Sequence, residues 1–197
     1  MRCTLNNKRK MTVIIEHKED INSDFEGTII DIETIGEFTK NRSYTIFNDS
    51  RQCENVQQVI LGFINRNELK IFCAQGKEAI EELKSQTERI LNSLERPFFA
   101  FNADCESSVW FHHIGIIINF DGELQKFKFE KKSEARKSLN IPNYDDPFND
   151  EGELCMRAWE NGEFDKAIAH NRACLLKERE IFLKRGYREP NKINFNR

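Results

Sequence analysis

Two carboxylates lie within an otherwise apolar, β-branched stretch, and this feature limits the possible folds of the chain more than any other. The stretch, residues 27–36, reads GTIIDIETIG, with Asp31 and Glu33 two positions apart. β-Branched residues favour a buried strand, and a glycine at each end is typical of turns. Because alternate side chains of a strand share a face, Asp31 and Glu33 are expected to lie side by side.

Two neighbouring acids on an apolar strand repel each other and lose hydration when they are buried. A divalent cation between them offsets both penalties, and oxygen ligands of this kind favour hard ions such as Mg²⁺ or Mn²⁺. The stretch therefore predicts a metal site at Asp31 and Glu33. An edge strand with a solvated acidic face is the structural alternative, because short motifs also arise by chance.

The composition is typical of one globular domain. The chain has 197 residues, of which 39% are hydrophobic, and this is enough for a single full-sized core. No apolar run is long enough to span a membrane and the N-terminus lacks the apolar core of a signal peptide, so we expect a cytoplasmic, intracellular protein with no membrane partner. The net charge of −3 excludes a basic coat protein but not a nuclease.

The hydrophobic pattern predicts strands and helices that alternate along the chain. Strands are expected at residues 27–36, 43–47, 69–74, 98–101, 114–120 and, after a hairpin turn, 124–129, and residues 11–16 are expected to form a strand or an extended arm. Helices are expected within residues 77–94, 102–113, 131–144, 153–160 and 164–184, while 56–64 fits either a strand or a helix. This order describes an α/β domain with a mixed sheet, in which sites lie at the carboxyl ends of strands.

Three short motifs, in this order, resemble those of the DEDD 3′–5′ exonuclease family in its histidine-containing (DEDDh) form. They are DIET at residues 31–34, NADCE at 102–106 and HNRAC at 170–174. The resemblance covers most of the chain and implies a single α/β domain of the ribonuclease H-like fold, a mixed β-sheet flanked by helices. It implies an N-terminal arm or extra strand at residues 1–26, the exonuclease-type domain at 27–186 and a C-terminal tail at 187–197.

The resemblance also implies roles for the matching residues. Asp31, Glu33 and Glu106 would bind two Mg²⁺ or Mn²⁺ ions that clamp the scissile phosphate. His170 would act as the base that takes a proton from the attacking water. The residues expected to bind substrate are Thr34, Asn102 and Asn171.

The second and third motifs depart from the family pattern. Glu106 stands where the family has Asp, and Asp104 is an additional acid. Cys174 occupies the position of the fourth family acid, and a thiol is a poor ligand for Mg²⁺. Glu178 shares a helix face with His170 and Cys174, but it would replace that acid only if the helix shifted by about one turn, ~5.4 Å.

The first function that the resemblance implies is a divalent-metal-dependent 3′–5′ exonuclease acting on single-stranded DNA or RNA ends. The alternative, favoured by Cys174, is a catalytically inactive exonuclease-like domain that serves as a nucleic-acid-binding or protein-interaction module. A third hypothesis is a redox sensor that uses Cys105 and Cys174, which requires both thiols to be exposed and to have a low pKa. None of the six cysteines forms a C-x-x-C pair, which argues against a zinc ribbon or a thioredoxin-like site.

Overall fold

Six strands form one mixed sheet in this computed structural model, which describes residues 13–197. The strands are β1 (Ile14–Asp20), β2 (Thr28–Gly36), β3 (Val56–Ile64), β4 (Glu68–Ala74), β5 (Phe98–Ala100) and β6 (Gly122–Glu123). Their order across the sheet is β1-β4-β3-β2-β5-β6. The pairs from β1 to β2 are antiparallel, whereas β2, β5 and β6 run parallel. The predicted α/β domain with a mixed sheet is confirmed.

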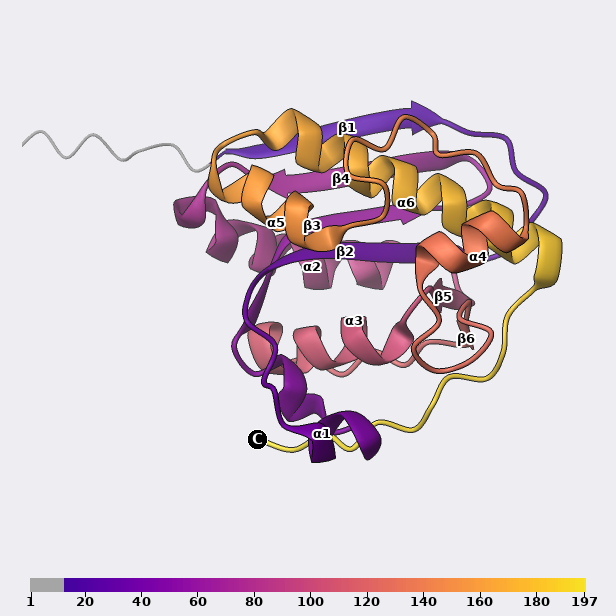
Figure 1. The fold of residues 1–197 in the computed structure, drawn as a ribbon. Helices are drawn as coiled ribbons and strands as arrows, with labels where there is room; N and C mark the ends of the chain where they lie inside the picture. The colour runs from indigo at the N-terminus through magenta and orange to yellow at the C-terminus, as the bar shows by residue number, and fades with distance from the viewer. Residues whose placement is uncertain (1–12) are drawn as a thin grey trace, which may run out of the picture.

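Helices cover both faces of this sheet (Figure 1). They are α1 (Arg42–Ile46), α2 (Ile80–Ser93), α3 (Ala103–Val109), α4 (Lys132–Ser138), α5 (Gly152–Glu160) and α6 (Phe164–Arg185). Shorter turns of 3₁₀ helix occupy Ser50–Cys53 and Lys77–Ala79, and a π-helical turn, Trp110–Ile114, follows α3. The long helix α6 packs across β2, β3 and β4 next to α5, while α2 packs on β3 and β4 from the opposite face.

The two central strands are buried because both of their faces are covered. In β2 every residue from Thr28 to Glu33 is buried, and β3 is buried except at Gln57. Near-continuous apolar runs of this kind suit strands with helices on both faces. The register between β2 and β3 shifts between Glu33 and Thr34, which marks a β-bulge directly after the second acid. Such a bulge changes the direction in which the following side chains point.

Three predicted strands are wrong. Residues 43–47 lie in and just after helix α1, because the Asn41 side chain accepts a hydrogen bond from the Ser43 amide at 3.0 Å and caps a helix there. Residues 114–120 form no strand. The sheet is extended instead by β6, which runs parallel to β5 and is aligned by Asp121, whose carboxylate accepts from the Phe98 amide at 2.7 Å. The predicted hairpin is therefore also wrong, and its expected second strand, residues 124–129, forms a loop.

The ends of the described chain pack against the domain. Strand β1 pairs with β4 and adds an edge to the sheet, starting later than the predicted 11–16. Residues 1–12, the first part of the predicted arm at 1–26, lie outside the described part. The C-terminal segment returns to α1, where the Asn194 amide donates to Asn48 O at 2.9 Å (Figure 1). Across residues 13–197, no helix has both the length and the apolar character that crossing a membrane requires.

Candidate functional site

Helix α6 approaches the acidic strand closely because β3 has a glycine opposite Asp31. Gly62 pairs with Asp31 in the sheet register, and a Cβ added there would lie 2.0 Å from Oδ1 of Asn171. Asn171 on α6 uses this space and donates from Nδ2 to Oδ2 of Asp31 at 2.7 Å. The predicted substrate ligand Asn171 is thus buried and holds the first acid in place.

The other oxygen of Asp31 contacts a lysine. The Nζ atom of Lys132, from α4, lies 3.0 Å from Asp31 Oδ1 and 2.5 Å from Oε1 of Glu178 on α6. Burial favours the neutral amine, but Asp31, Cys174 and Glu178 raise the pKa of Lys132 well above its ordinary value, so this side chain is a cation. An ammonium therefore bridges two buried carboxylates at the position where the sequence predicts a metal ion.

Glu178 and Glu106 complete this acidic cluster. Glu178 reaches Lys132 without the one-turn helix shift that the sequence suggested, and it is fully buried. Glu106, on α3, is also buried, and its Oε2 has no hydrogen-bond partner among the described residues. Burial raises the pKa of both carboxyl groups well above the ordinary value, with nearby Asp31 adding to the effect. Asp31 and Glu178 thus share one ammonium, and Glu106 lies near both of these acids.

Glu33 contacts a different set of residues. His170 Nε2 lies 3.7 Å from Glu33 Oε1 and 3.7 Å from the Cys174 sulfur. One potential ligand atom from each of these three residues falls within 4.8 Å of the others, and no other group of His, Cys and acidic residues in the described part meets that distance. Burial raises the pKa of Glu33 to about 7, although His170 opposes this shift. The two acids of the strand therefore have separate partners.

A buried ion network lies behind His170. Its Nδ1 is 2.7 Å from Oδ1 of Asp146, and Oδ2 of Asp146 accepts from Lys177 Nζ at 2.6 Å. Lys177 also donates to Asp150, at 2.6 Å. Burial opposes ionisation of Asp146, but His170 and Lys177 lower its pKa below the ordinary range. Asp146, Lys177 and Lys132 were not identified by the sequence analysis; the acid-rich run at residues 144–150 was the one local signal.

The remaining predicted residues lie apart from these clusters. Asp104 accepts a hydrogen bond from Asn191 at 3.0 Å and contacts none of the other predicted acids through a described hydrogen bond or ion pair. Thr34 follows the bulge in β2 and is partly exposed. Asn102 caps α3 without a side-chain hydrogen bond and lines a cleft of about 840 Å³.

The cysteines do not meet the conditions of a redox sensor. Cys174 is 3% exposed, and burial raises the pKa of its thiol. Cys105 is only partly exposed, and its contact with Cys53, together with burial, raises its pKa well above the ordinary value. A reactive thiol needs the opposite shift.

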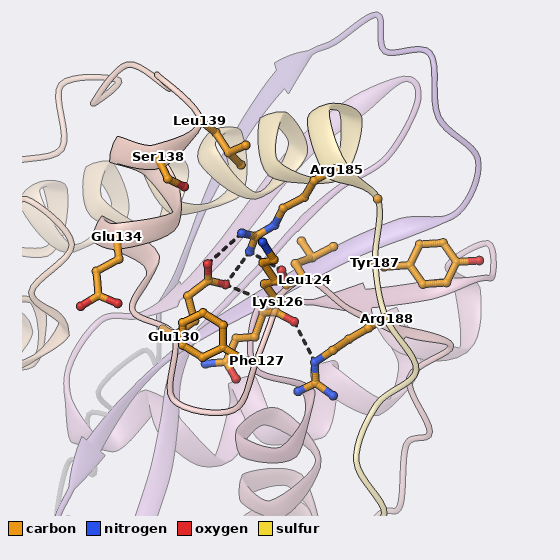
Figure 2. Close-up of a pocket in the computed structure, with 12 residues that line it drawn as sticks. Leu124, Lys126, Phe127, Glu130, Glu134, Ser138, Leu139, Arg185, Tyr187 and Arg188 are labelled. Carbon is orange, nitrogen blue, oxygen red and sulfur yellow. Dashed lines mark hydrogen bonds and ion pairs between the residues drawn. The ribbon is translucent and has the colours of Figure 1, made fainter.

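The loop of residues 126–131 lines two cavities. The first is the cleft at Asn102, which is also lined by the cations Lys131, Lys132, Arg136 and Lys137. The second is a groove of about 610 Å³ lined by Phe127 and by Arg185 and Arg188 (Figure 2). Comparison of the chain with protein-family models, with curated proteins and with solved structures gave no match.

Proposed function

We propose that this chain is a ribonuclease H-like, exonuclease-type domain that has lost hydrolytic activity and binds single-stranded nucleic acid. The mixed sheet with two acids on a central strand, and α6 carrying His170 across that strand, support the fold assignment. The order of the three motifs along the chain supports the exonuclease relationship.

The proposed loss of hydrolytic activity rests on the position of the Lys132 ammonium between Asp31 and Glu178. Two-metal hydrolysis requires two divalent ions in a site that is open to the scissile phosphate. Here a fixed monovalent cation bridges two carboxylates, and the acids around it are closed to solvent. Asp31 is 6% exposed and Glu106 is 5% exposed. Cys174, in place of an acid, removes a further hard ligand.

The loop of residues 126–131 supports nucleic-acid binding. Its sequence, KFKFEK, alternates lysine with phenylalanine, and the Phe127 and Phe129 side chains are 56% and 64% exposed. Exposed aromatic rings beside cations are the elements that stack bases and attract the phosphate backbone of single strands. Phe129 has a φ of 72°, a left-handed conformation that is rare for a bulky residue. Strained backbone of this kind is often retained at binding sites.

The conformation of this loop is fixed by Glu130. Its carboxylate accepts from the Lys126 amide at 2.7 Å and pairs with Arg185 Nη2 at 2.6 Å, as Figure 2 shows. The Gln125 side chain donates to Glu130 O at 3.0 Å. The two phenylalanines are therefore presented by an ordered loop, which reduces the entropy lost on binding. The adjacent cleft adds Lys131 and Lys137, whereas Lys132 and Arg136 at the same cleft are paired with buried acids.

A direct test uses 5′-labelled single-stranded DNA and RNA with Mg²⁺ or Mn²⁺. We expect the oligonucleotides to stay full length and to bind the protein in a salt-dependent manner, as measured by fluorescence anisotropy. Replacing both Phe127 and Phe129 with Ala should weaken binding by about 10-fold or more, because stacking contributes ~1–3 kcal/mol per base. The control is Ile117→Ala, which removes another exposed apolar side chain. Absence of binding to both DNA and RNA would refute the nucleic-acid assignment.

The second candidate is the active divalent-metal-dependent 3′–5′ exonuclease. The observation that favours it is the number of buried carboxyl groups, since Asp31, Glu106 and Glu178 offer more oxygen ligands than Lys132 occupies, and Glu106 Oε2 has no partner among the described residues. Mg²⁺ or Mn²⁺ would then displace the lysine. In the same assay, a ladder that shortens from the 3′ end with wild-type protein, but not with Asp31→Asn, would establish the exonuclease and overturn the inactive domain.

A further inference from the structure

We propose that Glu33, Cys155, His170 and Cys174 form a closed binding site for one soft divalent transition-metal ion, for which Zn²⁺ is the best match. Glu33, His170 and Cys174 already have their potential ligand atoms within 4.8 Å of one another. They come from β2 and α6, and the fourth comes from α5, which packs against both. The site is separate from the Asp31–Lys132–Glu178 cluster and does not require the proposed nucleic-acid binding.

Cys155 is the fourth ligand because of its position. It is 1% exposed and lies on α5, which packs against both β2 and α6. The Glu33 carboxylate and the Cys174 thiol are near enough to help burial raise the pKa of its thiol. Its described hydrogen bond is a long one, 3.8 Å from the sulfur to Ala167 O. This weak contact is readily exchanged for a metal–thiolate bond, which brings the donor set to two sulfurs, one imidazole nitrogen and one carboxylate oxygen.

This donor set selects the metal. Zn²⁺ is bound by four ligands in structural sites, and thiolate, imidazole and carboxylate are its usual donors. Mg²⁺ and Mn²⁺ prefer oxygen ligands, so two thiolates discriminate against them. The substitution that removes the predicted fourth acid, Cys174, is thus the one that creates a soft site. Because all four protein ligands are present, no open position is left for catalysis.

His170 is already oriented for such a site. Its Nδ1 is held by Asp146 at 2.7 Å, so Nε2 faces Glu33 and Cys174. A carboxylate on the second nitrogen of a metal-bound histidine is common, because it fixes the direction of the ring. Asp146 is in turn held by the buried Lys177. A bound ion would connect β2 to α5 and α6, so we expect the metal to stabilise the folded domain.

The test is metal analysis of the full chain purified without added metal, together with Co²⁺ titration of the chelator-treated protein. We expect about one Zn²⁺ per chain and, with Co²⁺, thiolate-to-metal charge-transfer absorption. Cys155→Ser and Cys174→Ser should each weaken the absorption and lower Zn²⁺ affinity by about 10-fold or more. Cys53→Ser, a buried cysteine outside the cluster, is the control and should retain both properties.

Two results would overturn the site. One is wild-type protein that contains no stoichiometric Zn²⁺ and gives no thiolate absorption with Co²⁺. The other is unchanged absorption in Cys155→Ser and Cys174→Ser, which would place the thiolate ligands elsewhere. Because the titration of the wild-type chain gives an answer by itself, the proposal stays testable even where a variant does not fold. Nuclease or nucleic-acid-binding activity does not enter either readout.

Discussion

The ammonium of Lys132 lies 3.0 Å from the carboxylate of Asp31, the acid on which the predicted metal site is centred. Lys132 belongs to α4, 101 residues further along the chain. A lysine that is held in this way can neutralise Asp31 without a divalent ion. This relationship leads to the first of four experiments on the stability of the domain.

Replacing Lys132 with Gln should destabilise the protein by about 3–5 kcal/mol, because Asp31 and Glu178 lose their shared cation while they stay buried. Urea unfolding measures this free energy. The matched control is Lys131→Gln, which alters an exposed neighbour and should change stability by less than about 0.5 kcal/mol. We also expect Mn²⁺ to recover part of the stability of Lys132→Gln. Equal stability of the two variants would contradict the bridging role.

Asp146→Asn should be similarly costly, by about 3–5 kcal/mol, because Lys177 and His170 lose a buried partner. The pKa of Asp146 is lowered in the folded protein, so its contribution is present above the ordinary value of 3.8 and is lost as the pH falls below it. Urea unfolding at neutral and acidic pH should therefore show a smaller difference between variant and wild type in acid. Asp145→Asn, at an exposed neighbouring position, should leave stability nearly unchanged.

Glu123 should make the stability of the protein fall as the pH rises, which is the opposite of the effect expected for Asp146. Burial, with Asp104 nearby, raises the pKa of Glu123 from 4.5 to about 7, although Arg188 opposes the shift and lies 2.6 Å away. Between those two pH values the folded protein binds more protons than the unfolded chain, so stability falls as the pH rises. We expect Glu123→Gln to lose this part of the decline. If the free energy of unfolding changes with pH in the same way for variant and wild type between pH 4.5 and 8, Glu123 does not cause this decline.

Gly62→Ala should force α6 away from the sheet. The new Cβ would lie 2.0 Å from Asn171 Oδ1 and 2.9 Å from Leu175 Cδ1, so we expect a loss of about 1–3 kcal/mol in thermal or urea unfolding. Adding Asn171→Ala should recover part of that loss and give a non-additive double-mutant cycle. Gly152→Ala, where nothing lies within 4 Å of the added Cβ, is the control. Additive effects would show that Asn171 does not fill the space at Gly62.

Much of the secondary structure follows from the local sequence. The β-branched run of β2 and the apolar stripe of α2 each have one periodicity, and both elements form where they are predicted. The short segments at 43–47 and 114–120 are ambiguous, because a few apolar residues fit more than one element. Their conformations depend on a side-chain cap at Asn41 and on the position of Asp121 beside β5.

The sequence by itself determined which side chains carry acidic, thiol and imidazole groups, and the elements on which Asp31, Glu33 and His170 lie. Only the tertiary structure decided their partners. Asp31 and Glu33 are two residues apart on one strand, yet the first contacts Lys132 and the second contacts His170. The reason is physical: strand periodicity is a local property, whereas the charge that neutralises a buried acid is supplied by whichever distant segment packs against it.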